Sequence, residues 1–109
     1  MENQNDLVKI KEAITLTLND ENIDAAGIYL FGSRARGDFS AKSDYDILLV
    51  TGRNMRIKEK IKLFTRLTRV LARKKYNVDI VIKSKDEANY YKSKIGHIVR
   101  SALKEGIPI

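Results

Sequence analysis

Three short apolar segments, and a long helical pattern between the last two, constrain the fold of this chain most strongly. Residues 28–31 (IYLF), 44–50 (DYDILLV) and 76–82 (YNVDIVI) have the length and the β-branched and aromatic content of buried strands. About a dozen polar residues separate the first two, so these strands are expected to pair antiparallel. Residues 55–75 predict a helix between the second and third, which favours a right-handed crossover and parallel pairing.

The spacing of apolar residues predicts the other helices. Residues 7–18 carry apolar side chains at steps of three and four, which is typical of one helix face. Residues 84–92 open at Ser84, three positions before Glu87, as in a capping box. A last helix is expected over residues 94–104.

The long helix 55–75 mixes apolar and basic residues. The side chains expected to face the core keep the helical step and are Ile57, Ile61, Phe64, Leu67 and Leu71. Lysines and arginines cover the remaining faces, which is typical of a solvated surface, with nucleic-acid or partner binding as the alternative. The predicted fold class is α/β (α+β), a single domain over residues 1–109 with a small mixed three-stranded sheet flanked by about four helices.

The composition limits the chemistry open to the chain. Its net charge of +7, from 21 Lys and Arg against 14 Asp and Glu, favours polyanionic partners such as nucleotides, nucleic acid or an acidic protein. The absence of cysteine excludes disulfides and thiolate sites, and a single histidine, His97, argues against a histidine-based zinc site. No apolar run approaches the roughly 18 residues of a membrane span, and the polar start MENQND is unlike a signal peptide, so a cytoplasmic location is expected.

The predicted topology brings three carboxylates to one edge of the sheet. Asp44 and Asp46, two apart on the second strand, are expected to project from the same face, and Asp79 at the start of the third strand lies beside them. Crowded carboxylates raise one another's pKa and cost stability unless a cation compensates. Oxygen ligands of this kind suit Mg²⁺ or Mn²⁺, and two such ions can clamp the attacking and leaving oxygens of a phosphoryl displacement.

A Gly-Ser turn follows the first strand and is expected at the same edge. Gly32 lets the backbone approach a ligand, and Ser33 offers a hydroxyl and an N–H group at the expected start of a helix. Arg34 and Arg36 add guanidinium groups that can neutralise a triphosphate. The acidic and basic parts together predict a nucleotidyl-transfer site, with its metal end at the α-phosphate.

Each of these features has a simpler explanation when it is taken alone. A Gly-Ser pair after a strand is commonly a turn, and an Asp-x-Asp pair is commonly a solvated strand entrance. Asp79 could instead form an ion pair with Lys83 or Arg73. Their joint occurrence, in this order and at one sheet edge, favours the catalytic interpretation.

The segment LFGSRARGDFSAKSDYDILLV, followed by VDIVI, resembles the minimal nucleotidyltransferases of the DNA polymerase β superfamily. The motif of that family is Gly-Ser or Gly-Gly, about ten residues, an Asp-x-Asp or Asp-x-Glu pair entering a strand, and a third acidic residue on a later strand. The residues that match it are Gly32, Ser33, Asp44, Asp46 and Asp79. The form GSRARG is most similar to the short prokaryotic members that act as the antitoxin of HEPN-type toxin–antitoxin pairs.

The resemblance implies a role for each of these residues. Asp44, Asp46 and Asp79 would hold two Mg²⁺ ions, and Asp79 is also a candidate base for the acceptor hydroxyl. The residues implied in phosphate binding are Gly32, Ser33, Arg34 and Arg36. The implied reaction transfers a nucleoside monophosphate, from ATP or another nucleoside triphosphate, to a hydroxyl with release of pyrophosphate. In the toxin–antitoxin pairs that hydroxyl belongs to a tyrosine of the toxin.

Other functions stay open at the level of sequence. The chain could neutralise a HEPN-type toxin by occlusion without significant catalysis, or transfer nucleotides to a small molecule or an RNA end. Larger members of the family carry a helical C-terminal domain that completes the cleft. Because this chain stops at Ile109, it is expected to supply half of such a cleft, completed by a partner chain or by a second copy in a homo-oligomer.

Overall fold

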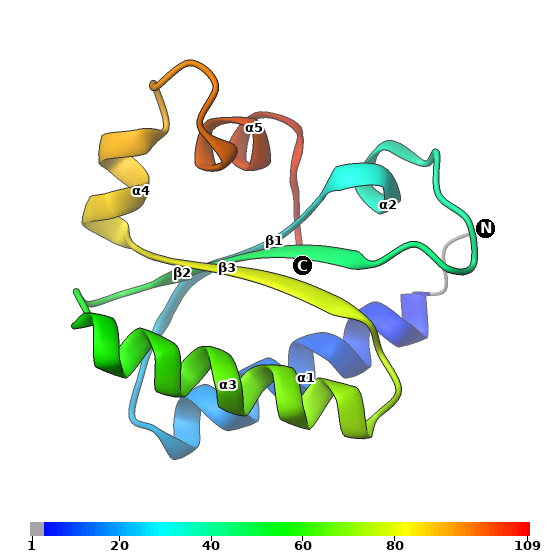
Figure 1. Cartoon of the computed structure of the whole chain (residues 1–109), viewed down its shortest axis with the longest axis horizontal. Coiled ribbons are helices and arrows are strands. Elements are labelled where there is room, and N and C mark those ends of the chain that lie inside the picture. Colours follow the sequence, from blue (N-terminus) through cyan, green and yellow to red (C-terminus); the bar gives the residue numbers. More distant parts are fainter. Residues whose placement is uncertain (1–3) are drawn as a thin grey trace.

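Four strands form one mixed sheet in the computed structural model, which describes residues 4–109 (Figure 1). The strands are β1 (Ala25–Phe31), β2 (Tyr45–Thr51), β3 (Val78–Ser84) and β4 (Ile107–Pro108). The helices are α1 (Gln4–Asp20), α2 (Gly32–Arg36), α3 (Ile57–Arg73), α4 (Lys85–Tyr91) and α5 (Ile98–Glu105). The order across the sheet is β3-β2-β1-β4.

The pairing of the three long strands is as predicted. β1 runs antiparallel to β2, and β2 runs parallel to β3, with α3 as the crossover between them. The register places Asp46 opposite Phe31 of β1 on one side and opposite Asp79 of β3 on the other. The end of β1 and the starts of β2 and β3 therefore meet at one edge of the sheet.

The prediction of three strands and about four helices was incomplete. After α5 the chain turns back, and Ile107 and Pro108 pair antiparallel with Leu30 and Tyr29 of β1 as β4. A strand of two residues has no periodic pattern from which the sequence could reveal it. The additional helix, α2, is a single short turn of helix that begins at the glycine directly after β1.

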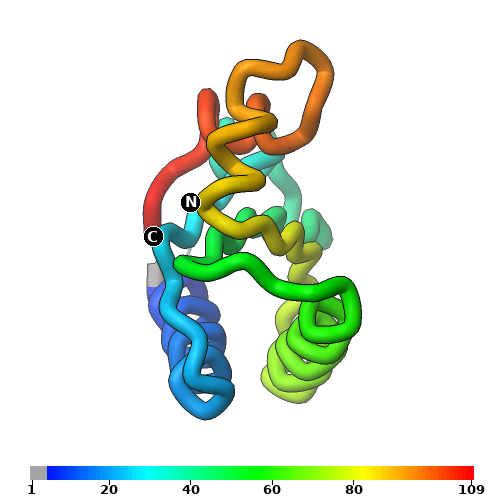
Figure 2. Tube along the Cα trace, turned by 90° about the vertical axis from the view of Figure 1, so that its left-hand side faces the viewer, coloured from blue at the N-terminus to red at the C-terminus, as the bar shows by residue number. Residues whose placement is uncertain are grey.

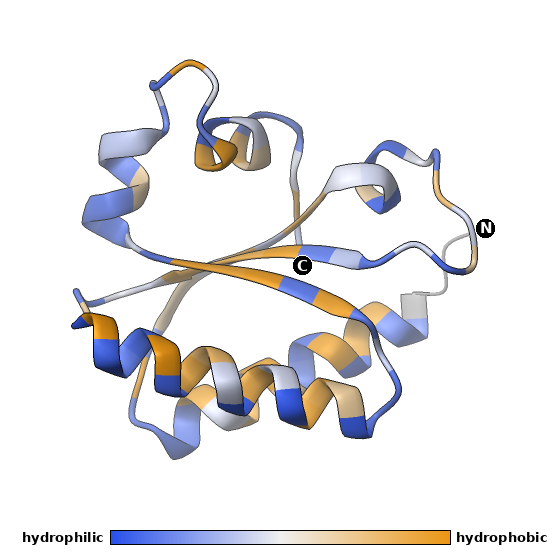
Figure 3. Cartoon of the chain, in the orientation of Figure 1, coloured by the Kyte–Doolittle hydropathy of each residue, from blue (hydrophilic) through white to orange (hydrophobic). Residues whose placement is uncertain are grey.

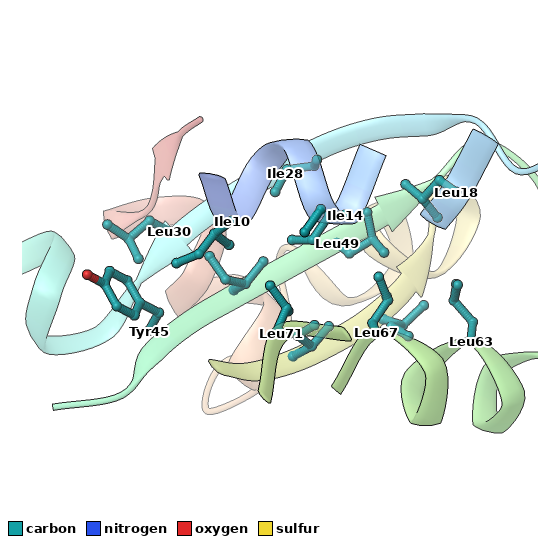
Figure 4. Close-up of a cluster of buried hydrophobic side chains, with 14 of the residues drawn as sticks. Ile10, Ile14, Leu18, Ile28, Leu30, Tyr45, Leu49, Leu63, Leu67 and Leu71 are labelled. Carbon is teal, nitrogen blue, oxygen red and sulfur yellow. The ribbon is translucent and has the colours of Figure 1, made fainter. Parts of the chain in front are cut away.

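Helices cover both faces of the sheet. α1 and α3 lie side by side under one face, while α4 and α5 lie over the other (Figures 1 and 2). The larger core fills the space between the sheet and α1 and α3, and its side chains include Ile10, Ile14, Leu18, Leu30, Leu49 and Leu67 (Figure 4). A smaller cluster under α4 and α5 contains Phe31, Leu48, Val50, Ala88, Val99 and Ala102. The central strands are accordingly the most continuously apolar part of the chain (Figure 3).

Within residues 4–109, no helix is both long and apolar enough to cross a membrane.

The face that α3 buries differs from the predicted one. The side chains that α3 buries are Leu63, Leu67 and Leu71. Three residues predicted for the core, which we call the outer row, are instead exposed: Ile57 (73%), Ile61 (61%) and Phe64 (42%). The helix carries two adjacent apolar rows, and the sequence alone does not show which of them meets the sheet. Arg66 pairs with Asp20 and Glu21 at the end of α1. The side of α3 that faces away from the outer row is therefore the side held against α1.

The predicted capping box at Ser84 is confirmed and is linked to α3. The Glu87 N–H donates to Ser84 Oγ (3.1 Å), and the Ser84 N–H donates to Glu87 Oε1 (2.9 Å). Lys60 Nζ on α3 contacts both carboxylate oxygens of Glu87 at 2.6 and 2.7 Å. Burial on its own would raise the pKa of Glu87, but the bonds from Lys60 and Ser84 outweigh it and hold the pKa below 4.5.

Glu87→Gln is expected to lower the free energy of unfolding at pH 7 by about 1 kcal/mol, because the capping carboxylate also carries the ion pair. Since the folded-state pKa is lowered, this contribution is present above pH 4.5 and is lost as the pH falls below it. Urea denaturation at pH 7 and pH 3 should therefore show a difference from the unmodified chain only at pH 7. Glu12→Gln, at an exposed position on α1, is the matched control and should show none.

Candidate active site

Asp46 and Asp79 occupy adjacent strands at the same level of the sheet. The two residues are directly paired in the parallel ladder between β2 and β3. Ile47 and Ile80, the next residues along, belong to the core under α1 and α3. Because side chains alternate along a strand, both carboxylates project from the other face, which carries α2 and α5. Two acidic side chains from segments far apart in sequence thus lie together.

Gly32 brings the backbone of the Gly-Ser turn against Asp46. Its φ is +73°, a left-handed conformation that L-residues with a side chain rarely adopt. A Cβ atom placed on Gly32 would lie 2.1 Å from Asp46 Oδ2. Glycine is therefore required here for two reasons, the backbone conformation and the space that the carboxylate occupies.

The surroundings of Asp46 disfavour the ionised form of its carboxyl group. Partial burial, followed by repulsion from Asp79 and Asp44, raises its pKa above the ordinary 3.8, and the positive charge of Arg36 opposes this only in part. Ionised Asp46 therefore costs the folded chain free energy. The site would gain stability from a cation placed among the three carboxylates.

Asp44 was predicted to be the first residue of the second strand, but it lies just before β2, which begins at Tyr45. It is exposed, and together with Asp79 it lines an open hollow of about 270 Å³ beside the end of α3. Thr68 and Asn77, which the sequence analysis did not single out, line the same hollow. Their small polar side chains carry no motif, so only their position next to Asp44 and Asp79 identifies them.

The donor set fits a hard divalent cation by its chemistry. All three side chains offer carboxylate oxygens, which Mg²⁺ and Mn²⁺ prefer, and their mutual repulsion at Asp46 is the kind that such an ion relieves. Among residues 4–109, however, no three acidic, histidine or cysteine side chains stand close enough together to enclose a metal ion. Binding would require a rearrangement of side chains, and both Asp44 and Asp79 are exposed at this edge.

The two arginines of the turn have different surroundings. Arg34 Nε donates to the Ser43 carbonyl oxygen (3.0 Å), and its guanidinium lies 4.0 Å from the centre of the Tyr45 ring and 4.8 Å from that of Phe39. Arg34 therefore holds the segment that leads into β2. Arg36 is exposed on the other side, where it pairs with Asp38 and with Glu105 of α5 at 3.3 Å each.

The predicted phosphate ligands Gly32, Ser33, Arg34 and Arg36 all stay predictions. The Ser33 carbonyl oxygen accepts hydrogen bonds from the N–H groups of Gly37 and Asp38, which closes the turn after α2. Of the two arginines, Arg36 is the one whose charge acts on Asp46, because it lowers the pKa of that carboxyl. Arg36 is thus the better placed to reach a phosphate group near the acidic pair.

Neighbouring carboxylates of this kind, beside a tight glycine turn, are the donors with which two-metal enzymes transfer phosphoryl or nucleotidyl groups. Residues 11–102 match the sequence profile of the family described as Polymerase beta, Nucleotidyltransferase. The match covers most of the chain, and the chain belongs to this family of nucleotidyltransferases. The resemblance noted in the sequence is thereby confirmed. No curated protein matched the sequence.

Solved structures show the same fold. One from Sulfolobus solfataricus, designated a nucleotidyltransferase, has 24% identity and a TM-score of 0.62, over 96% of this chain and 82% of its own. A second, designated a minimal nucleotidyltransferase, has 22% identity and a TM-score of 0.61, over 100% of this chain and 97% of its own. A third, a toxin–antitoxin with AMP-PNP, has 22% identity and a TM-score of 0.54, over 98% of this chain and 72% of its own.

Proposed function

We propose that this chain transfers AMP from ATP to a tyrosine hydroxyl of a HEPN-type toxin, releases pyrophosphate, and thereby acts as its antitoxin. The observation that carries the proposal is the pairing of Asp46 with Asp79 on adjacent strands, with the backbone of Gly32 packed against Asp46. Family membership supplies the reaction class. The similar toxin–antitoxin structure with AMP-PNP, an ATP analogue, supports the choice of donor and of partner.

The chain's own residues divide the work of the reaction. The acceptor oxygen attacks the α-phosphorus, and the bond from that phosphorus to the bridging oxygen breaks, so that pyrophosphate leaves with the electron pair. Asp79, exposed at the start of β3, takes the proton of the attacking hydroxyl. Arg36 and the Gly32–Ser33 turn hold the phosphates. Two Mg²⁺ or Mn²⁺ ions, held by Asp44, Asp46 and Asp79, would neutralise the phosphate charge.

Intact-mass spectrometry tests this proposal. The chain is mixed with ATP, Mg²⁺ and a purified HEPN-type protein, and a parallel sample contains the Asp44→Asn, Asp46→Asn variant. We expect the partner to gain the mass of one or more AMP units with the unmodified chain only. An unchanged partner mass, or an equal gain with the variant, would refute transfer at this site.

A second function, toxin neutralisation by occlusion alone, is favoured by one observation. Within residues 4–109 no three acidic, histidine or cysteine side chains stand close enough together to enclose a metal ion, which favours a role that needs none. Occlusion predicts that Asp46→Asn neutralises the toxin as well as the unmodified chain does when both are mixed with it in equal amounts. If the variant fails while it still binds the toxin, neutralisation needs the chemistry.

A further inference from the structure

β3 is an edge strand with an unpaired outer side. The sheet order places it at one end, and among residues 4–109 no other strand pairs with it beyond β2. Figure 1 shows β3 on the near side of the molecule, with α3 against one face of the sheet and α4 over the other. Along Val78–Ser84, the backbone groups that face away from β2, apart from the Ser84 N–H that donates to Glu87, are thus available for hydrogen bonding to another strand.

The outer row of α3 borders this edge. Ile61 and Phe64, together with Lys60, line an open hollow of about 220 Å³ whose fourth side is Ile82 of β3. Ile57 lies one turn earlier on the same side of the helix and is the most exposed of the three. The apolar colour on the first turns of α3 in Figure 3 marks this region. An unpaired strand beside an exposed apolar helix face has the composition of an interface between protein chains.

We infer that β3 pairs antiparallel with β3 of a second copy of this chain, around a two-fold axis at Val81. The sequence of the strand is complementary to itself in this register. Asp79 then lies opposite Lys83 of the partner subunit, and Ile80 lies opposite the partner subunit's Ile82. Both charge pairs occur on the same face of the joined sheet, and both isoleucine pairs occur on the other.

Charges on an edge strand normally prevent pairing, because an unrelated strand leaves them without a partner. Asp79 and Lys83 are each two residues from Val81. In an antiparallel pair with a second copy, each of these charges therefore meets the opposite charge, and pairing is favoured for this partner only. Because the axis is perpendicular to the sheet, both copies of α3 lie on the same face. Their outer rows, next to Ile82, then approach each other across the axis and can bury the apolar area that each copy leaves exposed.

The inferred dimer adds a residue to the candidate active site. Asp79 is paired with Asp46 in the ladder, and its charge helps to raise the pKa of that carboxyl. Lys83 of the partner subunit would place an ammonium group beside Asp79, on the outer side of the acidic pair. Its role in transfer rests on the proposed function, whereas the dimer itself does not. Within one copy, Lys83 Nζ lies 5.4 Å from the centre of the Tyr91 ring.

Sedimentation velocity with charge-exchange variants tests the register. Asp79→Lys alone and Lys83→Asp alone each place like charges opposite each other at two symmetry-related positions. Each should therefore raise the dissociation constant of the dimer about tenfold. The double variant Asp79→Lys, Lys83→Asp restores opposite pairs and should restore the dimer. A monomer at all concentrations for the unmodified chain, or a double variant weaker than both single ones, would overturn the inference.

A single introduced thiol tests the axis directly, because the chain has no cysteine. Val81→Cys places two thiols opposite each other, within the Cα distance that a disulfide spans, so mild oxidation should give a covalent dimer. Asp79→Cys, whose two copies would lie four residues apart along the paired strands, should not cross-link. Equal cross-linking of both variants, or of neither, would contradict the register.

The outer row has a matched control on another helix. Ile61→Glu should shift the chain to monomer, while Leu16→Glu on α1, at a similarly exposed apolar position, should leave the dimer unchanged. Equal effects of the two would show that the row is not at the interface. These measurements contain no nucleotide, so their outcome is separate from that of the transfer assay. Binding of the HEPN-type protein to β3 of a monomeric chain would assign this surface to that partner and overturn the inferred dimer.

Discussion

Asp46→Asn is expected to abolish nucleotidyl transfer and at the same time to make the folded chain more stable at neutral pH. The amide removes a charge that burial and the neighbours Asp79 and Asp44 disfavour. The gain in the free energy of unfolding should be up to about 1 kcal/mol, the usual size of a cross-strand side-chain interaction. Transfer and thermal unfolding at pH 7, measured on the same preparation, check both parts.

The sign of the pH dependence follows from the raised pKa. Between 3.8, the ordinary value, and the higher folded-state pKa, the folded chain binds more protons at Asp46 than the unfolded chain does. The stability of the unmodified chain therefore falls as the pH rises through this window, and Asp46→Asn should lack this fall. Glu12→Gln, at an exposed position on α1, should change neither stability nor transfer. A destabilised Asp46→Asn, or one that retains transfer, would contradict the role given to this carboxylate.

Gly32→Ala should lower both the stability and the transfer activity of the chain. It forces a left-handed conformation on alanine, at about 1–2 kcal/mol, and it also places Cβ where Asp46 Oδ2 lies. The carboxylate must move, and a displacement of about 1 Å in a reacting group costs on the order of 100-fold in rate. We expect a loss of stability greater than the backbone cost alone and a transfer rate reduced at least ~100-fold.

Gly37→Ala is the control that separates the two effects of Gly32→Ala. Gly37 also has a left-handed backbone, with φ of +86°, but a Cβ there meets no atom within 4 Å. It should show the backbone cost in a denaturation experiment and keep its transfer activity. If both alanine variants lose activity equally, the close approach of Gly32 to Asp46 has no catalytic meaning.

The sequence was sufficient to predict the features that depend on strong local patterns and on chain connectivity. The three long strands, their directions and the crossover helix follow from segment length and loop length, and these in turn place Asp79 beside Asp46. The cap at Ser84 follows from a four-residue motif whose hydrogen bonds are entirely local. For these features, local preference and the packed structure agree.

The features that the sequence did not predict depend on tertiary contacts. Leu63 and the outer row of α3 are equally apolar, and only the position of the sheet decides that Leu63 is buried and Ile61 is exposed. The pairing of Ile107 with Leu30 involves too few residues to leave a pattern. The stacking of Arg34 on Tyr45 was not predicted either, because it depends on the path of the loop between β1 and β2, and its phosphate-binding role stays a prediction.

Turnover is the most direct test of whether the Asp46–Asp79 pair is catalytic. The chain is incubated with ATP, Mg²⁺ and a large molar excess of the HEPN-type protein, and both AMP incorporation and pyrophosphate are followed with time. We expect the whole acceptor pool to be modified, with one pyrophosphate released for each AMP attached, and no modification with Asp79→Asn. Modification that stops at one acceptor per chain, or that persists in Asp79→Asn, would contradict an enzyme acting through these carboxylates.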